Sequence, residues 1–417
     1  MGTFGRLDEL GVAAKRASTG LAGLPSARKD AALLAMASAL VERAPEILEA
    51  NADDVRNATS GGASTAVIDR LALSEDRVEQ MADGLRQVEA LRDPIGEVIG
   101  GWTLPNGLKV QKVRVPLGVI GVIYEGRPNV TVDAAGLAVK AGNAVLLRGS
   151  RIAQHSNASL IEVIAAAGTE AGLPEGSIQA VPPTRESARA MMRARGVIDL
   201  LIPRGGNDLI QTVVRESLVP VIETGIGNCH VYVDASADLE KALNILVNAK
   251  VQRPGVCNAA ESFLVHRAVA DEFVPKALAA LAEHGVKVYG DETIQGFGDE
   301  VLPATDEEFG AEFLDLTISG AVVDSLEAAI DHVNRFGTKH TEAIVTQDYE
   351  AARRFVEAVD AAAVMVNAST RFTDGGEFGM GAEIGISTQK LHARGPMALP
   401  ELTTYKFVVH GTGQIRE

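Results

Sequence analysis

The stretch VPLGVIGVIYE at residues 115–125 decides the fold. It is an apolar, β-branched run of strand length, and it is followed by a helical pattern near 130–141 and a second apolar run, NAVLLRG at 143–149. A strand, a helix and a strand in that order form a pair of parallel strands joined by a crossover helix. The sequence therefore predicts an α/β fold built on parallel sheets.

The same alternation extends through most of the chain. Further strands are expected at 197–205 and 219–225, and helices near 155–171, 184–195 and 207–217. A second series after Gly225 predicts strands at 229–235, 262–269, 286–290, 320–325, 341–347 and 363–369, with helices near 236–250, 269–284, 325–336 and 349–359. Two such series predict two doubly wound α/β units.

The segments outside these series have other patterns. Residues 25–98 carry apolar side chains at helical spacing and should form helices that cover another surface. Residues 107–118 and 401–411 alternate apolar and polar side chains, which is typical of paired antiparallel strands. We expect them to form a small third sheet that makes subunit contacts.

Length, charge and cysteine content exclude several classes of protein. The 417 residues exceed what one hydrophobic core normally serves, and the net charge of −16 argues against general binding to nucleic acids or anionic membranes. No signal peptide and no run of ~18 apolar residues is found, which predicts a cytoplasmic protein. Cys229 and Cys257 make no disulfide framework, and no Cys/His spacing resembles a zinc site, so no metal is expected.

Candidate binding residues lie at the ends of predicted strands. Gly205 and Gly206 lead from a strand into a helix, where backbone N–H groups could hold a phosphate, although a simple glycine turn explains them equally well. Arg148 and Arg151 flank a Gly-Ser turn at another strand end, where they suit a ribose phosphate or form a solvated surface pair. Glu223 ends a further expected strand and is either functional or an ordinary turn carboxylate.

The stretch PGVCNAAES at 254–262 contains the candidate nucleophile. Cys257 lies between a Pro-Gly turn and small residues that could open a helix. Composition alone favours a buried thiol, because free cysteines are usually small core residues. Cys229 should be packed in a strand, and no role follows from the sequence for the neighbouring His230.

Two motifs resemble those of the aldehyde dehydrogenase superfamily. They are ETGIG at 223–227 and PGVCNAAES, and Glu223 precedes Cys257 by the 34 positions that separate the superfamily's glutamate from its nucleophile. The resemblance covers almost the whole chain. It extends to GNAVLLRGSR, where Arg148 takes the place of a lysine, and to Glu312 in EFLDL, which matches a later glutamate better than the neighbouring EEFG.

Further motifs narrow the resemblance to one branch of the superfamily. The stretches that resemble this branch are YEGRPNVTVDA, ETGIGNCHVYVD, RPGVCNAAES and ELTTYK. Members of the branch reduce L-glutamyl 5-phosphate to L-glutamate 5-semialdehyde in proline biosynthesis. The resemblance implies an aldehyde dehydrogenase-like fold with two doubly wound α/β domains and a small β oligomerisation element.

The resemblance also assigns domains. It implies a cofactor-binding domain at 1–106 and 119–224, a catalytic domain at 225–388 and oligomerisation strands at 107–118 and 389–417. We therefore expect a homo-oligomer. Functional coupling to glutamate 5-kinase, which makes the unstable acyl phosphate, is left open.

The cofactor and substrate residues follow from the same resemblance. NADP(H) is expected rather than NAD, because Arg151 stands where many NAD-preferring relatives have an acid, and an arginine pairs with a 2′-phosphate. The residues expected to bind this cofactor are Arg148, Ser150, Arg151, Gly205, Gly206 and Glu312. The residues expected to bind the substrate are Arg127, for its phosphate, and Ser369, Thr370 and Arg371, for its carboxylate.

The implied reaction passes through a thioester. Cys257 attacks the acyl phosphate, phosphate leaves, and hydride from NADPH reduces the thioester to the aldehyde. Asn129 or Asn258 is expected to assist the backbone N–H of Cys257 in binding the oxyanion, and Glu223 is a candidate proton shuttle. The site should lower the thiol pKa from about 8.5, since only the thiolate attacks.

Two other functions remain open. A hydrolytic NAD(P)-dependent semialdehyde dehydrogenase shares the superfamily motifs, but YEGRPN and Arg151 argue against it. A non-catalytic scaffold of the same fold would have to explain why Cys257 and Glu223 keep the spacing of an enzyme.

Overall fold

The computed structural model describes residues 7–416, which divide into two compact units. The first unit comprises residues 7–223, 379–385 and 397–416, and the second comprises 224–378 and 386–396. Residues 1–6 of the predicted cofactor-binding domain and residue 417 of the predicted oligomerisation segment lie outside the described residues.

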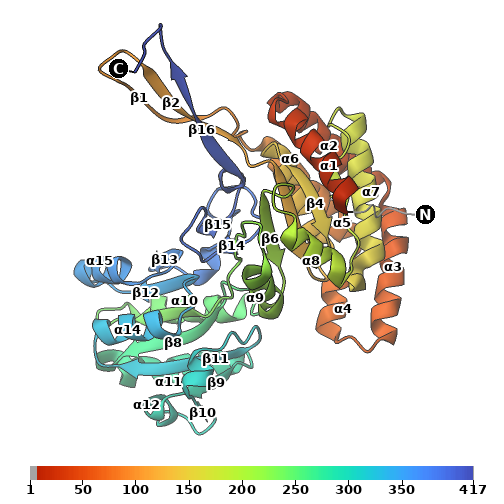
Figure 1. Ribbon diagram of the computed structural model, residues 1–417. Helices are drawn as coiled ribbons and strands as arrows, with labels where there is room; N and C mark the ends of the chain where they lie inside the picture. Colours follow the sequence, from red (N-terminus) through yellow and green to blue (C-terminus); the bar gives the residue numbers. More distant parts are fainter. Residues whose placement is uncertain (1–6, 417) are drawn as a thin grey trace. The chain divides into compact units, whose positions relative to one another are not determined.

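The first unit is built on a four-stranded parallel sheet in the order β5-β4-β3-β6. The strands are β3 (Val119–Tyr124), β4 (Ala144–Arg148), β5 (Ile178–Ala180) and β6 (Leu200–Arg204). Helices α1, α6 and α7 contact them, and Figure 1 shows these helices gathered around the sheet. The helices of this unit are α1 (Leu7–Ala22), α2 (Ser26–Glu42), α3 (Ala44–Ser60), α4 (Thr65–Leu71), α5 (Glu75–Ala90), α6 (Asn129–Lys140), η1 (Arg151–Ala153), α7 (Gln154–Glu170), α8 (Arg185–Arg193), α9 (Asn207–Glu216) and η3 (Pro400–Leu402).

A separate antiparallel sheet, β1-β2-β16, also belongs to the first unit (Figure 1). Its strands are β1 (Val98–Thr103), β2 (Lys109–Pro116) and β16 (Thr403–His410). The pairing of β2 with β16 was predicted, whereas β1 was not. Trp102, Tyr405 and Phe407 are exposed on this sheet, and Phe407 contacts each of the other two rings edge to face.

The second unit is built on a seven-stranded parallel sheet in the order β10-β9-β11-β8-β7-β12-β13. Its strands are β7 (Cys229–Val233), β8 (Ala260–His266), β9 (Lys287–Gly290), β10 (Leu302–Pro303), β11 (Thr317–Val323), β12 (Thr341–Val345) and β13 (Ala363–Val366), and a small antiparallel pair adds β14 (Ile386–Ser387) and β15 (Gly395–Pro396). Its helices are α10 (Leu239–Val251), α11 (Arg267–Glu283), α12 (Glu292–Gln295), α13 (Asp306–Phe309), α14 (Leu326–Phe336), α15 (Tyr349–Ala358) and η2 (Thr370–Phe372).

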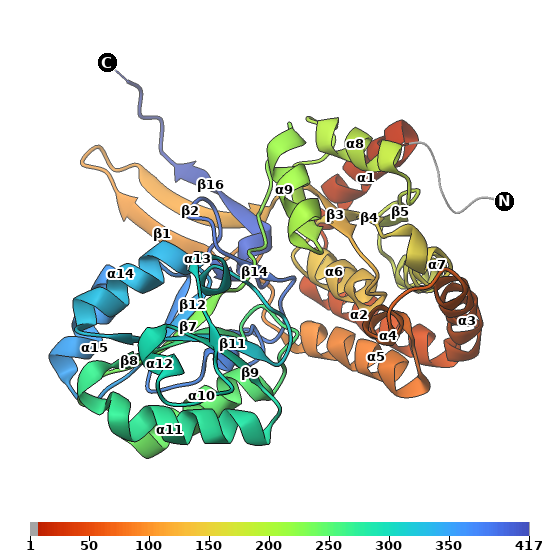
Figure 2. The same cartoon turned by 90° about the horizontal axis from the view of Figure 1, so that it is seen from below.

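Helices cover both faces of this seven-stranded sheet, because alternate residues of its strands point to opposite sides (Figure 2). Val231 and Phe263 pack with the apolar side chains of α10 and α11. Tyr232 and Leu264 pack with those of α14 and α15. The two parallel sheets with crossover helices confirm the predicted α/β class.

Two local predictions were wrong. Residues 219–225 form no strand, and the stretch makes two isolated bridges instead, from Val221 to Leu201 and from Thr224 to Ser387. The small residues after Cys257 do not open a helix but pass through a turn into β8, because Ala260 and the residues after it pair with β7. The cysteine therefore lies before a strand and not at a helix N-terminus.

Candidate active site

In the first unit, the predicted binding residues follow β3, β4 and β6 at the carboxyl edge of the parallel sheet. β3 lies between β4 and β6, so the chain order reverses at this central strand. Arg127 and Asn129 follow β3, Arg148 ends β4, and Gly205 and Gly206 follow β6. Open α/β sheets bind ligands outside the carboxyl ends of their strands at such a reversal.

A carboxylate occupies part of the predicted phosphate site. The N–H of Gly206, the residue before α9, donates to Oε2 of Glu125 at 2.8 Å. A Cβ on Gly205 would lie 2.5 Å from the same oxygen, so the glycine permits this approach. The N–H at the start of this helix is thus bonded to a side chain of the protein, and the phosphate site at Gly205 and Gly206 stays a prediction.

Arg148 and Ser150 present polar atoms at the same edge. The guanidinium of Arg148 donates from Nη2 to the carbonyl of Thr184 at 2.9 Å, whereas its Nε is buried without a hydrogen-bond partner. Burial lowers the pKa of Arg148. Oγ of Ser150 is also buried without a hydrogen-bond partner. These two orphaned atoms fit a site that is completed by a polar ligand such as a dinucleotide.

Asn129 is the first residue of α6, and its side chain is exposed. Its Nδ2 donates to Oδ2 of Asp133 one turn later at 3.1 Å. Burial raises the pKa of Asp133 to about 6, while Asn129 and Arg204 act in the opposite direction. One N–H of the Asn129 amide is thus held within the helix. Arg127 is exposed.

Glu223 ends the first of the three chain segments that form the first unit. Its Oε1 accepts a hydrogen bond from Nε2 of Gln211, a residue of α9, at 3.0 Å. The carboxylate is therefore positioned by a helix side chain, and not by the strand that the sequence predicted.

In the second unit, the nucleophile loop lies at the amino edge of the parallel sheet. Cys257 stands three residues before β8, and Gly227 stands two residues before β7, the neighbouring strand. A Cβ on Gly227 would lie 1.5 Å from the carbonyl oxygen of Cys257, so only glycine allows the two loops to approach this closely. The glycine motif and the cysteine motif, far apart in the sequence, therefore meet in the fold.

Carboxylates hold further loops at this edge. Oε1 of Glu312 accepts the N–H of Gly227 at 2.6 Å, and burial raises the Glu312 pKa. Glu261 forms a fully buried ion pair with Lys250 at 2.5 Å and accepts the N–H of Leu314 at 3.1 Å. Glu312, which was predicted to bind the cofactor, is bonded within the protein in this structure.

Asn258 ties the nucleophile loop to the segment that contains the predicted carboxylate-binding residues. Its Nδ2 donates to the carbonyls of Thr373 at 2.8 Å and Arg371 at 3.4 Å. Both N–H groups of the amide are thereby used inside the fold. This arrangement leaves Asn258 unable to donate its side chain to an oxyanion without breaking these bonds, so its geometry fits a structural role.

Ser369, Thr370 and Arg371 lie on this tied segment. Oγ of the buried Ser369 accepts the N–H of Arg371 at 3.3 Å, and Oγ1 of Thr370 is fully buried without a hydrogen-bond partner. Arg371 donates from Nε to Oε1 of Gln252 at 2.8 Å. Burial lowers the pKa of Arg371, as does the charge of Arg253, while Asp374 and Cys257 oppose this.

The sequence interpretation missed Arg253. It is exposed and lies four residues before Cys257, and its charge repels that of Arg371. An anionic ligand beside both guanidinium groups would relieve their repulsion. Arg253 is the first residue of the motif RPGVCNAAES, so its place in this motif was the sequence feature that pointed to it.

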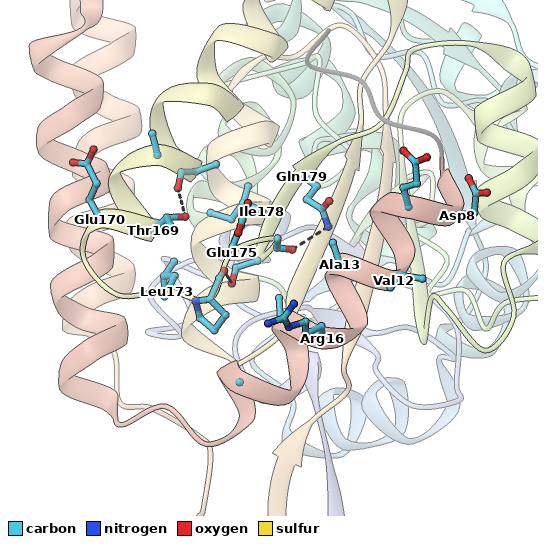
Figure 3. Close-up of a pocket in the computed structure, with 18 residues that line it drawn as sticks. Asp8, Val12, Ala13, Arg16, Thr169, Glu170, Leu173, Glu175, Ile178 and Gln179 are labelled. Carbon is cyan, nitrogen blue, oxygen red and sulfur yellow. Dashed lines mark hydrogen bonds between the residues drawn. The ribbon is translucent and has the colours of Figure 1, made fainter.

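A pocket in the first unit is lined by none of the predicted site residues. Figure 3 shows it between α1, the end of α7 and the start of β5. Its lining includes Asp8, Arg16, Glu170, Glu175 and Gln179.

Within residues 7–416, no three His, Cys, Asp or Glu side chains are grouped in a way that could hold a metal ion. No helix in this part of the chain has the length and apolar character needed to cross a membrane.

Comparison with known proteins defines the class. The model of the aldehyde dehydrogenase family matches residues 6–296. The fold is also shared with an acetylating aldehyde dehydrogenase from Geobacillus thermoglucosidasius, at 18% identity and a TM-score of 0.71, with 98% of this chain and 97% of the other covered. The chain therefore belongs to the aldehyde dehydrogenase family.

Several relatives that are more similar to this chain carry one name. The chain is 58% identical over 404 residues to the gamma-glutamyl phosphate reductase of Thermobifida fusca, covering 97% of each chain, and 58% identical over 408 residues to that of Moorella thermoacetica, covering 98% of each. The crystal structure of gamma-glutamyl phosphate reductase from Thermotoga maritima matches with a TM-score of 0.97 at 48% identity, covering 99% of this chain and 100% of the other. These relatives confirm the branch that the sequence motifs indicated.

Proposed function

We propose that the chain reduces L-glutamyl 5-phosphate to L-glutamate 5-semialdehyde with NADPH and releases phosphate, as a cytoplasmic enzyme of proline biosynthesis. The observation that carries this proposal is the approach of Gly227 in the ETGIG motif to the carbonyl of Cys257. The two motifs thus meet at the backbone of Cys257, in a chain that is 58% identical to named reductases.

The thiolate of Cys257 attacks the acyl carbon, and the C–O bond to phosphate breaks. The acyl group is retained as a thioester and inorganic phosphate carries away the bonding electrons. The oxyanion that forms during this exchange requires preorganised donors, for which the backbone N–H of Cys257 and the second N–H of Asn129 are our candidates. Glu223 is proposed to move the proton of the thiol.

The substrate is an anion at both ends, and the chain offers separate groups for each. We assign its carboxylate to Ser369, Thr370 and Arg371, since Oγ1 of Thr370 lacks a hydrogen-bond partner. The phosphate is assigned to Arg127 and to the newly identified Arg253. Guanidinium groups suit phosphate because they offer two parallel N–H donors.

The carboxyl edge of the first unit would hold the dinucleotide. We assign its binding to Arg148, Ser150, Arg151, Gly205 and Gly206, with Glu312 on the second unit, and the orphaned Arg148 Nε and Ser150 Oγ support this assignment. When bound, the reduced nicotinamide supplies the hydride that converts the thioester to the aldehyde. Arg151 favours NADP over NAD, because it can pair with a 2′-phosphate.

A homo-oligomer is part of the proposal. The β1-β2-β16 sheet exposes Trp102, Tyr405, Phe407 and Val409 together, and exposed apolar patches of this kind mark protein contacts. Truncation after Pro400 removes β16 and should give monomers in analytical ultracentrifugation. Phe407→Glu is a milder variant that keeps the strand, and a full-size oligomer in both variants would exclude this sheet as the contact. Coupling to glutamate 5-kinase is proposed only as a functional link through the unstable acyl phosphate.

The reaction can be tested in the oxidative direction. NADPH formation from glutamate 5-semialdehyde and NADP is followed with and without inorganic phosphate, for the wild type and for Cys257→Ala. We expect activity that requires both phosphate and Cys257, because phosphate releases the acyl group from the thioester. Sodium sulfate at the same ionic strength controls for a salt effect, and NAD replaces NADP in a parallel series.

Each other outcome favours a different function. Activity without phosphate would indicate a hydrolytic dehydrogenase, since water would then release the thioester. Absence of activity under all conditions would support a scaffold of the same fold. Equal rates with NAD and NADP at saturation would overturn the cofactor assignment and leave the reaction assignment intact.

A further inference from the structure

The second cysteine touches the backbone of the first. Cys229 begins β7 and is fully buried. Its Sγ donates a hydrogen bond to the carbonyl oxygen of Cys257 at 3.2 Å. This carbonyl is the same group that Gly227 approaches, so the peptide that follows the nucleophile is fixed from two sides.

The thiol of Cys229 is itself held by a chain of hydrogen bonds. Oγ1 of Thr341 donates to Oγ1 of Thr373 at 2.9 Å and lies 2.8 Å from Nδ1 of His340. The thiol sulfur lies 3.8 Å from the same Nδ1. With a proton on Nδ1, His340 donates to Oγ1 of Thr341, the nearer acceptor, and lies beside the sulfur, so the thiol proton remains for the carbonyl of Cys257.

Electrostatics keep the Cys229 thiol in its donor form. Burial raises its pKa well above the ordinary value, and Glu342, Cys257 and Glu261 raise it further. A protonated thiol can donate, whereas a thiolate would repel both the carbonyl oxygen and a neighbouring thiolate.

We propose that Cys229 is a positioning residue for the nucleophile: its thiol, oriented by His340, fixes the Cys257 carbonyl and with it the direction of the Cys257 side chain and N–H. This inference rests on the proposed role of Cys257 as the nucleophile. A carbonyl that is held by a donor cannot rotate toward the attacking sulfur, where its negative end would oppose the thiolate. Displacements of about 1 Å at a reacting group can cost about 100-fold in rate, so fixing this peptide matters to catalysis.

The test compares three variants of the full chain. Cys229→Ala removes the donor, Cys229→Ser keeps a donor of similar size, and Val231→Ala makes a cavity in the same strand within the core that packs on α10 and α11. We expect Cys229→Ala to lower kcat by about three- to tenfold, with KM for the semialdehyde changed less than about twofold, because a neutral hydrogen bond contributes modestly. Cys229→Ser should recover most of kcat, and Val231→Ala should lower thermal stability while kcat stays unchanged.

A second readout needs no substrate. Iodoacetamide alkylation of Cys257, assigned by mass spectrometry of the peptide, should slow in Cys229→Ala and recover in Cys229→Ser. Equal kcat and alkylation rates in Cys229→Ala and wild type would overturn the inference, as would equal impairment of the alanine and serine variants, which would indicate packing alone. A wild type without phosphate-dependent activity would instead overturn the proposed function, and the alkylation series would still decide the role of Cys229.

Discussion

The two units place their candidate groups at opposite edges of parallel sheets. In the first unit the residues follow the strands, at the carboxyl edge, and several of them are exposed, such as Arg127 and Asn129. In the second unit Gly227 and Cys257 precede the strands, at the amino edge, and the groups around them are mostly buried and bonded to one another.

The difference reflects what each edge must do. A carboxyl edge presents helix N-termini and open N–H groups, which suit a ligand that comes and goes. An amino edge presents no such dipoles, so a nucleophile there depends on loops that hold one another. Gly227, Glu312 and Asn258 provide these loop-to-loop bonds. Changes of charge at the ligand edge should therefore alter ligand binding but leave the fold intact. Changes of charge at the nucleophile edge should lower the stability of the fold.

The buried ion pair gives the largest expected effect. Lys250→Met leaves Glu261, whose pKa burial already raises to about 7, in the core without its ion-pair partner, and this should lower the free energy of unfolding by about 3–5 kcal/mol in urea denaturation. The double variant Lys250→Met/Glu261→Gln should recover much of the loss, because no buried charge remains. An unchanged midpoint in the single variant would mean that internal charges do not hold the amino edge.

Gly227→Ala tests the close approach at the same edge. The new Cβ would overlap the carbonyl of Cys257, so the nucleophile loop must shift. We expect kcat to fall by about 100-fold or more in the phosphate-dependent assay, with circular dichroism unchanged. Gly255→Ala is the matched control, since its Cβ would lie 3.6 Å from the carbonyl of Leu314. Similar losses in both variants would show that the loop responds to any added methyl group.

A charge reversal tests the carboxyl edge. Arg151→Asp should raise KM for NADP by about 10–100-fold and change KM for NAD much less, because one charge-assisted contact to the 2′-phosphate is lost. Steady-state kinetics with both cofactors measure this ratio. Arg193→Asp, at the far end of α8, controls for the change in net charge. Parallel losses with both cofactors would remove Arg151 from the 2′-phosphate site.

The sequence predicted the carboxyl edge better than the amino edge, for a physical reason. Strand ends, glycines and helix starts are local patterns, so Arg148 and Gly205 were placed correctly at the ends of their strands. The occupation of the Gly206 N–H by Glu125 could not be predicted, because the two residues lie on different strand ends and only the fold brings them together. The bond from Cys229 to Cys257 likewise joins strand β7 to the turn before the neighbouring strand β8.

The motif around Cys257 singled this residue out as the candidate nucleophile, but the conformation of the residues around it was not predicted. Small residues after Cys257 have no strong helix or strand preference, and pairing with β7 decides their conformation. The exposed strand β1 was missed because its sequence VIGGWT carries two glycines and lacks regular alternation. Pairing with other strands therefore decides the conformation of both segments, which local sequence patterns do not predict.

A substitution of Asp133 gives the smallest expected effect. It tests whether a buried carboxylate also lowers the stability of the protein at the ligand edge. Its pKa in the folded protein, about 6, lies above the ordinary 3.8, so its contribution to stability is fully present below pH 3.8 and is lost as the pH rises through about 6. Asp133→Asn cannot ionise and should be more stable than the wild type by about 1–2 kcal/mol near pH 7, with no gain near pH 4. Urea denaturation at both pH values measures this, with the exposed Asp271→Asn as the control. An equal loss of stability at both pH values would show that Asp133 acts only as the hydrogen-bond partner of Asn129, and the carboxyl edge would then be no more strained than the amino edge.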